Sequence, residues 1–332
     1  MAPRKYKKAP RSTAVDRIGD LPDEIVHHIL SFLPAQEAVR TSVLARRWRH
    51  LWRSATGLRI VGIEGADTVQ ELRQFVDHLL ILRGHAELHT FEIGISEFSQ
   101  EDVPLFLNLY EPPLVSRHLR ALDLEGVRLQ GAFLDFTSCP ALEDLKMKQS
   151  HIYLEKIVSR SLQRLSIIGC SSDMYYRISI STPCLISFTL DGFQDKTPLL
   201  ESTPLLETAF VRLGCDYYDT CHNYEDGLFC GANDSSCPNC LAYNDGMSKT
   251  VLLGALYNAK HLELISTSEM FIFARDLKWC PTFNKLKTLL LNEYWCVGPD
   301  FDALTCILKH SPVLEKLTLQ LVSEGQQAHK WK

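Results

Sequence analysis

The residues best suited to chemistry are cysteines that gather in one stretch of the chain. Residues 214–248 contain five cysteines, six acidic residues and neither lysine nor arginine. Cys237 and Cys240 have the two-residue spacing of a zinc knuckle, and Cys221 and Cys230, or His222 in place of one of them, could complete four ligands. The acidic surroundings would raise the thiol pKa values, so a metal would itself have to displace the protons. Free cysteines in a flexible loop are the alternative, because only one such pair is present and the other spacings are irregular.

Motifs that mark common enzyme sites are absent from the sequence. It contains no Walker-type phosphate loop, no Gly-x-Gly-x-x-Gly, no His-Glu-x-x-His and no Gly-x-Ser-x-Gly. The cysteines have no basic neighbour that would ionise them. The adjacent His27 and His28 are explained more simply as the solvated edge of a helix than as a metal pair. We therefore expect a chain that is not an enzyme and has no cofactor.

Length and composition set further bounds. The chain has 332 residues, of which 45% are hydrophobic and 23% charged, as expected for a soluble protein with one long domain and one small one. No run of eighteen apolar residues is present, so we expect no membrane segment. The net charge of -5 makes a poor nucleic-acid binder, although residues 1–20 carry six basic side chains against two acidic ones. Those basic residues are either a nuclear import signal or an ordinary disordered terminus, and we expect a nuclear or cytoplasmic protein.

Residues 20–54 read as three short helices. The first ends at Pro34 and is apolar over more than half its girth, so one face can close a small core while the other remains available for a partner. The second turns Ala38, Val39 and Val43 inward, and the third carries two tryptophans. So short a segment cannot bury enough apolar surface to be stable alone, and we expect it to pack against another structure.

A repeated pattern fills most of the remaining chain. After a strand near residues 58–61 and a helix near residues 67–82, the form L-x-x-L-x-L recurs with conservative exchanges, at intervals of 20 to 31 residues and one of 53. Such intervals are typical of leucine-rich repeats. The fold class that follows is α/β, a small helical module followed by a horseshoe-shaped solenoid with a parallel sheet on its concave face. The nine copies span residues 88–93, 119–124, 142–147, 162–167, 185–190, 206–211, 259–264, 286–291 and 314–319.

Strand geometry predicts which residues the concave face exposes. The residue between the last two apolar positions of each copy points outward, because side chains alternate along a strand. Two members of this outward row, Phe210 and Leu290, are apolar where water is expected, which indicates either an interaction site or a covering loop. We expect the row to contribute to substrate binding. Its members are Glu92, Asp123, Lys146, Ser166, Thr189, Phe210, Glu263, Leu290 and Thr318.

The N-terminal helices carry a family resemblance. The stretch from Leu21-Pro22-Asp23-Glu24-Ile25 to Arg47-Trp48-Arg49 and Leu51-Trp52 resembles an F-box, the module that binds Skp1-type adaptors. It departs from that pattern at Ala45, where a small polar residue is usual, and alanine offers no oxygen to cap the third helix. The resemblance places the adaptor-binding residues at Leu21, Pro22, Ile25, Ile29, Leu30, Val39, Leu44 and Trp48.

An F-box followed by irregular leucine-rich repeats resembles the plant F-box/LRR family, whose members are substrate receptors of SCF ubiquitin ligases. The resemblance implies a Skp1-like adaptor and, through it, a cullin as partners, with an unidentified substrate protein on the repeats. A repeat scaffold that works outside any ubiquitin ligase is the alternative.

The expected division of the chain follows from these patterns. The chain ends soon after a repeat, so we expect either an exposed last repeat or a shortened form. The segments are a basic tail (1–19), the F-box (20–54), a linker strand and helix (55–86), the repeats (87–325) with the cysteine insertion (214–248), and a C-terminal tail (326–332).

Overall fold

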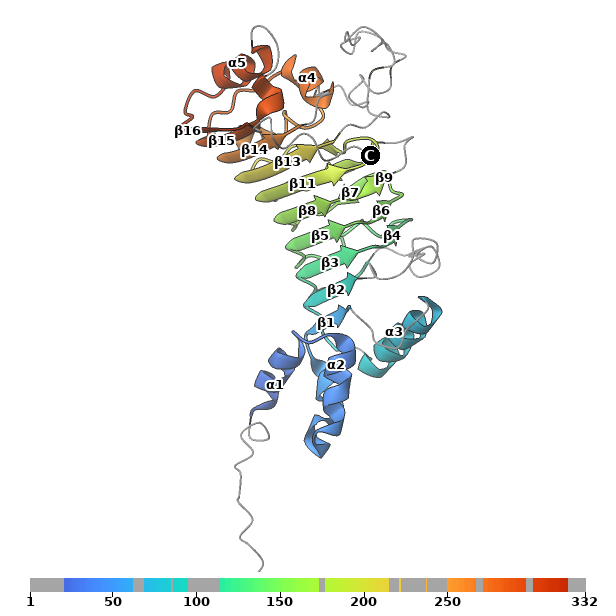
Figure 1. The fold of residues 1–332 in the computed structure, drawn as a ribbon. Coiled ribbons are helices and arrows are strands. Elements are labelled where there is room, and N and C mark those ends of the chain that lie inside the picture. Colours follow the sequence, from blue (N-terminus) through green and yellow to red (C-terminus); the bar gives the residue numbers. More distant parts are fainter. Residues whose placement is uncertain are drawn as a thin grey trace, which may run out of the picture.

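Short helices at the N-terminus lead into a long stack of parallel strands (Figure 1). This mixed α/β architecture, a helical module followed by a parallel-strand solenoid, confirms the predicted fold class. Among the described residues, no helix combines the length and apolar character needed to cross a bilayer. The computed structural model describes residues 21–61, 69–84, 86–94, 114–172, 177–214, 221, 237, 250–266, 271–296 and 301–321.

The N-terminal helical module closes around a small apolar core. Val26, Leu30, Trp48 and Trp52 are buried in it. The third helix is a 3₁₀ helix rather than an α-helix, and Ala45 before it makes no side-chain cap, a loss of about 1 kcal/mol relative to a serine. The elements are α1 (Asp23–Leu30), α2 (Ala35–Arg40), η1 (Thr41–Val43) and η2 (Arg46–Ser54).

Ten parallel strands form the main sheet. Equivalent residues of neighbouring repeats pair with each other, as expected of stacked repeats. The strand at residues 57–60, which was expected in a linker, is the first strand of this sheet. In order across the sheet the strands are β1 (Gly57–Ile60), β2 (Thr90–Gly94), β3 (Ala121–Glu125), β5 (Asp144–Lys148), β8 (Arg164–Ile168), β11 (Ser187–Phe193), β13 (Thr208–Leu213), β14 (His261–Ile265), β15 (Thr288–Asn292) and β16 (Lys316–Gln320).

The apolar positions of successive strands meet inside the stack. Leu122, Leu145 and Leu165 are paired across β3, β5 and β8, and each is almost fully buried. Each such leucine contributes about 1.5 to 3 kcal/mol by leaving water. On the last described strand, β16, the equivalent Leu317 and Leu319 are exposed because no further described strand packs beyond them.

The layer behind the main sheet differs along the stack. Behind the central strands the chain forms two three-stranded sheets, while helices lie behind the C-terminal strands (Figure 1). These elements are β4 (Arg128–Leu129), β6 (His151–Ile152) and β9 (Ser171–Ser172); β7 (Lys156–Val158), β10 (Ser179–Ser181) and β12 (Leu199–Leu200); and η6 (Leu256–Asn258), α4 (Phe271–Leu277), η7 (Glu293–Cys296) and α5 (Asp302–Lys309).

The helical module is joined closely to the first strand. Pro34 forms a bridge with Arg59 of β1, and the Arg59 guanidinium donates to the carbonyl oxygen of Phe32 at 2.6 Å and to the Glu92 carboxylate at 2.5 Å. A Cβ atom on Gly57 would lie only 2.4 Å from the carbonyl oxygen of Ser31. The backbones therefore approach each other too closely for any residue larger than glycine at position 57.

A second helix secures the end of the module from the other side. Arg83, at the end of α3 (Val69–Arg83), is buried and donates to the carbonyl oxygen of Ala55 at 2.7 Å. Burial lowers the pKa of Arg83. Its head group satisfies a backbone carbonyl at the end of η2, where a helix leaves such groups without partners.

One buried carboxylate organises the chain beyond the cysteine-rich insertion. Asp276 in α4 is fully buried beside Arg275, whose Nη1 lies 2.7 Å from Oδ1. Its oxygens also accept the backbone N–H groups of Val251, Leu252 and Leu253 at 2.7 to 3.1 Å. This carboxylate therefore fixes the point at which residues 250–253 rejoin the solenoid.

We expect Gly57→Ala to destabilise the joint between the helical module and the sheet by about 1 to 3 kcal/mol, because the added methyl group overlaps backbone atoms. Gly214→Ala is the matched control, since no atom lies within 4 Å of its Cβ position. Hydrogen exchange of residues 21–61 measures the effect. Equal protection of these amides in both variants would contradict the close approach.

Asp276→Asn should lower the free energy of unfolding by about 3 to 5 kcal/mol, because it removes the negative charge that lies against the buried Arg275 guanidinium. Glu315→Gln removes one carboxylate of the exposed Lys287–Glu315 pair and should change stability by less than about 1 kcal/mol. Urea unfolding of both variants gives the comparison, and equal midpoints would show that Asp276 has no such role.

Candidate functional site

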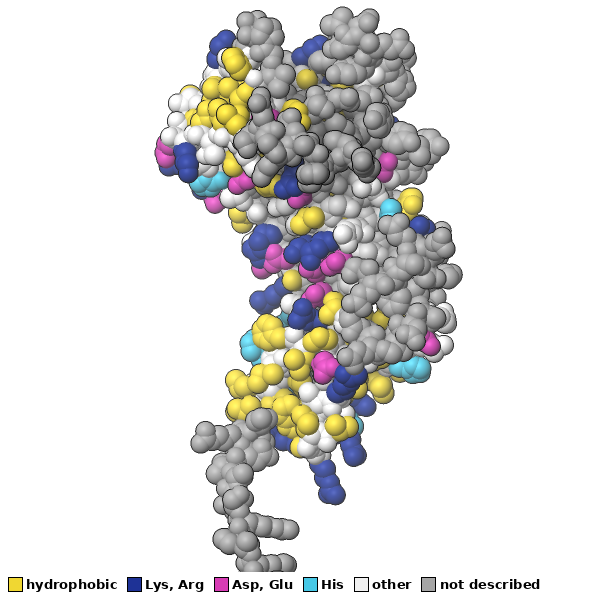
Figure 2. Space-filling model, in the orientation of Figure 1, with side chains coloured by type: hydrophobic (Ala, Val, Ile, Leu, Met, Phe, Trp, Pro, Cys, Tyr) yellow, Lys and Arg dark blue, Asp and Glu magenta, His cyan; other side chains and the backbone are white. Residues whose placement is uncertain are grey.

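The helical module exposes a cluster of large apolar side chains, which we call the docking face: Ile25, Ile29, Phe32, Val43 and Leu44. Three of them are more than half exposed, at 61% for Phe32, 84% for Val43 and 71% for Leu44. Figure 2 shows hydrophobic side chains gathered over this end of the molecule. Soluble proteins seldom expose so many large apolar residues together, so this face indicates a protein-interaction surface.

The arrangement of α1 explains how one helix serves two surfaces. Val26 and Leu30, four residues apart, point into the core, while Ile25 and Ile29 lie on the outward face. Arg47 of η2 holds the start of this helix by donating to the Asp23 carboxylate and to the carbonyl oxygen of Leu21, both at 2.5 Å. The outward face is thus presented on a helix whose opposite side is fixed.

Two residues expected on the adaptor-binding surface are not available to a partner. Leu30 is 1% exposed and Trp48 is 7% exposed, so both belong to the core of the module and that part of the expectation is wrong. Val43, expected to point inward, instead lies on the docking face. The helical pattern could not assign the faces because α1 is apolar on both.

The other expected adaptor-binding residues lie nearer the surface. Pro22, Ile25, Ile29 and Leu44 are exposed. Leu21 and Val39 are partly buried and pack against the core. Their role in binding stays a prediction.

The concave face of the solenoid carries the predicted outward row in one continuous register. The row has one further member that was not predicted, Arg59, which pairs with Glu92 at its start. The alternation of Leu58, Arg59 and Ile60 could have indicated it. From Glu92 the paired residues run on through Asp123, Lys146, Ser166, Thr189, Phe210, Glu263, Leu290 and Thr318.

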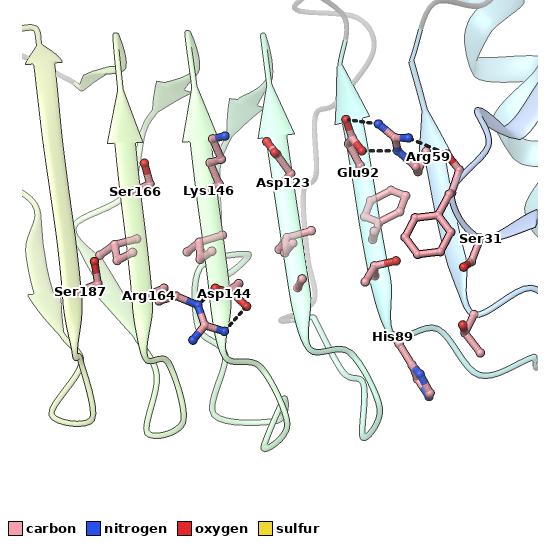
Figure 3. A pocket seen from close by; sticks show the side chains of 18 of the residues that line it. Ser31, Arg59, His89, Glu92, Asp123, Asp144, Lys146, Arg164, Ser166 and Ser187 are labelled. Carbon is pink, nitrogen blue, oxygen red and sulfur yellow. Dashed lines mark hydrogen bonds and ion pairs between the residues drawn. The ribbon is translucent and has the colours of Figure 1, made fainter. Parts of the chain in front are cut away.

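Charged pairs line the part of the concave face nearest the helical module. An open groove of about 600 Å³ begins at Phe32 and Arg59 and follows the sheet (Figure 3). Within it Arg59 contacts Glu92, and Arg164 forms hydrogen bonds with Asp144 on the neighbouring strand. Opposite charges on adjacent strands stabilise each other and leave little net charge for a partner to match.

Two residues of this charged region have shifted pKa values. The hydrogen bond to Glu92 raises the pKa of Arg59. Burial raises the pKa of Asp123, and Lys148 and Lys146 act in the opposite direction. The Lys148 ammonium lies 3.9 Å from the Asp123 carboxylate and 3.6 Å from the Glu125 carboxylate, so it interacts with both acidic side chains of β3.

The character of the groove changes toward the C-terminal strands. Ser166 and Thr189 follow the charged part, and a second hollow of about 440 Å³ then includes Phe210 and Leu290. Both apolar side chains are partly exposed, and the Arg212 guanidinium lies 5.5 Å from the centre of the Phe210 ring. His261, Glu263 and Lys316 also line this hollow, so it places two apolar side chains among polar and charged groups.

Half of the predicted zinc ligands can be placed. Cys221 and Cys237 are buried and their sulfur atoms lie 3.8 Å apart, whereas Cys230 and Cys240 lie outside the described residues. Binding of a metal by these four cysteines stays a prediction.

Several other thiols are poor nucleophiles. Burial raises the pKa of Cys139, and it raises that of Cys170 to about 11. Both side chains therefore stay protonated near neutral pH, and the thiolate is the reactive form.

Comparison with known proteins identifies the helical module. Residues 18–57 match the family model of the F-box domain. An FBD-associated F-box protein of Arabidopsis thaliana is 29% identical over 255 residues, which is 60% of this chain and 62% of the relative. The meiotic F-box protein MOF of Oryza sativa subsp. japonica is 28% identical over 353 residues, which is 92% of this chain and 71% of the relative.

A third relative extends the similarity to proteins named for both modules. An F-box/LRR-repeat protein of Arabidopsis thaliana is 31% identical over 209 residues, which is 58% of this chain and 32% of the relative. The chain thus spans less than two thirds of the length of two of these three relatives. The chain carries an F-box domain ahead of a parallel-strand solenoid and is similar to plant F-box proteins, among them proteins named for an F-box and leucine-rich repeats.

Proposed function

We propose that this protein is a substrate-recognition subunit of an SCF-type ubiquitin ligase. In this proposal the docking face binds a Skp1-like adaptor, the adaptor connects the chain to a cullin, and the concave face holds the substrate protein. The chain itself performs no catalytic step. The observation that carries the proposal is the docking face, five large apolar side chains left exposed on an F-box whose own core is already complete.

The docking face has the chemistry of a protein interface. Exposed aliphatic and aromatic groups gain binding energy when a partner seals them from water. The face includes Phe32, whose carbonyl oxygen accepts a hydrogen bond from Arg59 on the first strand of the sheet. An adaptor bound there would be held at a defined position relative to the concave groove.

The concave row has the chemistry of a substrate site. Its charges are largely paired between strands, so specificity would come from the hydroxyl groups in the middle and from the apolar positions at Phe210 and Leu290. A folded substrate would present an apolar side chain to this second hollow. The charged groove beside the F-box would then contact the flanking residues.

The double variant Ile25→Asp/Leu44→Asp should weaken binding of a purified Skp1-type adaptor by about 30-fold or more, because buried charges replace apolar contacts. Val313→Asp is the control, since Val313 and Ile25 are equally exposed at 47%. Val313 lies between α5 and β16, the last strand of the sheet, whereas the F-box adjoins β1, the first strand. Calorimetric titration measures the affinity, and circular dichroism verifies the fold. Unchanged binding by the double variant would assign the adaptor to another surface and favour a scaffold outside the ligase.

Two single variants, Phe210→Asp and Leu290→Asp, test the concave face. Each should abolish co-purification of the proteins that accumulate on this chain when the proteasome is inhibited. Adaptor binding should persist in both, because the docking face is untouched. Tyr153→Asp, on an exposed residue beyond the short strand β6, is the control. Retention of the same proteins by both concave-face variants would contradict substrate binding on this row.

A further inference from the structure

A cysteine, a second cysteine and a histidine meet behind the C-terminal strands, away from both candidate binding surfaces. Cys280 follows α4, Cys306 lies in α5, and His310 is the first residue after α5. Their sulfur and ring nitrogen atoms all lie within 4.8 Å of one another, and the Cys306 Sγ to His310 Nδ1 distance is 4.0 Å. All three side chains are partly buried.

The fold holds these three residues in place. Cys306 and His310 are four residues apart, so they lie on the same side of α5. The backbone N–H of Phe283 donates to the carbonyl oxygen of His310 at 2.8 Å, which ties the segment after Cys280 to the end of the helix. The N–H of Cys280 itself donates to the carbonyl oxygen of Leu277 at 3.3 Å.

The distances suit a small thiophilic cation. With zinc–sulfur and zinc–nitrogen bonds of about 2.3 and 2.0 Å, ligand atoms in a tetrahedral site are about 3.5 to 3.8 Å apart. The observed separations exceed these values by no more than about 1 Å, which side-chain rotation can close. Two sulfurs and one imidazole are also the ligand types that zinc prefers to the oxygen ligands of calcium or magnesium.

The ring of His310 lies against its own helix. Its Nδ1 is 2.8 Å from the carbonyl oxygen of Cys306 and 4.0 Å from Cys306 Sγ. Because the sulfur contact is made by Nδ1, His310 would bind a cation through this nitrogen, with the proton on Nε2 and the carbonyl contact released.

Reactivity is a weaker explanation for the same cluster. Burial, with the neighbouring Cys306 thiol, raises the pKa of Cys280 to about 12. Such a thiol is protonated near neutral pH and is a poor nucleophile. A metal that binds here must displace this proton, so the geometry of the three side chains carries the metal assignment.

We propose that Cys280, Cys306 and His310 bind a zinc ion that fastens α4 to α5 behind the last repeats. A water molecule completes the fourth position. This site is separate from the four cysteines predicted as ligands around residues 221–240. It is also independent of the ubiquitin-ligase function proposed above.

Cobalt(II) substitution of the purified full chain tests the site, because thiolate ligands give cobalt intense charge-transfer absorption. We expect one cobalt per chain that zinc displaces, and loss of the absorption in Cys280→Ser and in Cys306→Ser. His310→Gln should weaken cobalt binding at least tenfold while the sulfur-derived bands remain at saturating metal. Circular dichroism establishes that each variant is folded.

Two controls separate this site from other thiols. Cys184→Ser and Cys296→Ser remove partly buried free thiols that belong to no described cluster of metal-binding side chains, and both should keep the absorption. The double variant Cys221→Ser/Cys237→Ser removes the two placed cysteines of the predicted insertion site and should also keep it. Absence of cobalt absorption in the unmodified chain, or its loss only in that double variant, would overturn the proposal.

Discussion

Apolar side chains between the strands of the main sheet contact the equivalent side chains of the strands before and after. Leu122, Leu145 and Leu165 form part of such a row, in which each repeat buries the face that its neighbour leaves open. A single repeat could not stay folded alone, so the stability of the solenoid depends on these contacts between neighbours. Side chains alternate along every strand, so when the apolar residues pack inside the stack, the residues between them must point outward and form the concave row. Both the concave groove and the support for the F-box follow from that packing.

The close contact between the F-box and β1 gives the molecule its functional geometry. Gly57 allows the backbones to meet, and Arg59 connects the carbonyl oxygen of Phe32 with the carboxylate of Glu92. The first outward position of the sheet is thus also a structural part of the joint. A receptor of the proposed kind must hold its substrate at a fixed distance from the rest of a ligase, and a joint made of backbone contacts is well suited to that task.

Sequence reasoning was most successful where one periodicity decides the answer. The two-residue alternation placed nine outward residues that the structure pairs in one row, from Glu92 to Thr318. It was least successful on α1, because Leu30 and Ile29 are both apolar and an apolar surface that covers more than half the girth of a helix does not reveal which side meets its own core. Local sequence also gave no sign of the cluster at Cys280, Cys306 and His310, since a loop, a strand and a helix separate its first two members.

The uneven layer behind the sheet has a consequence for the shape that a bound protein would meet. Behind the central repeats the chain runs as short strands, which stack at the same spacing of about 4.8 Å as the strands in front. Helices such as α4 and α5 need about 8 to 10 Å, so the rear of the C-terminal repeats must spread relative to the front. On this ground the front of the sheet is expected to curve more near Phe210 and Leu290 than beside the F-box. A bound protein segment that follows the sheet would then have to bend as it passes from the F-box end to the C-terminal strands.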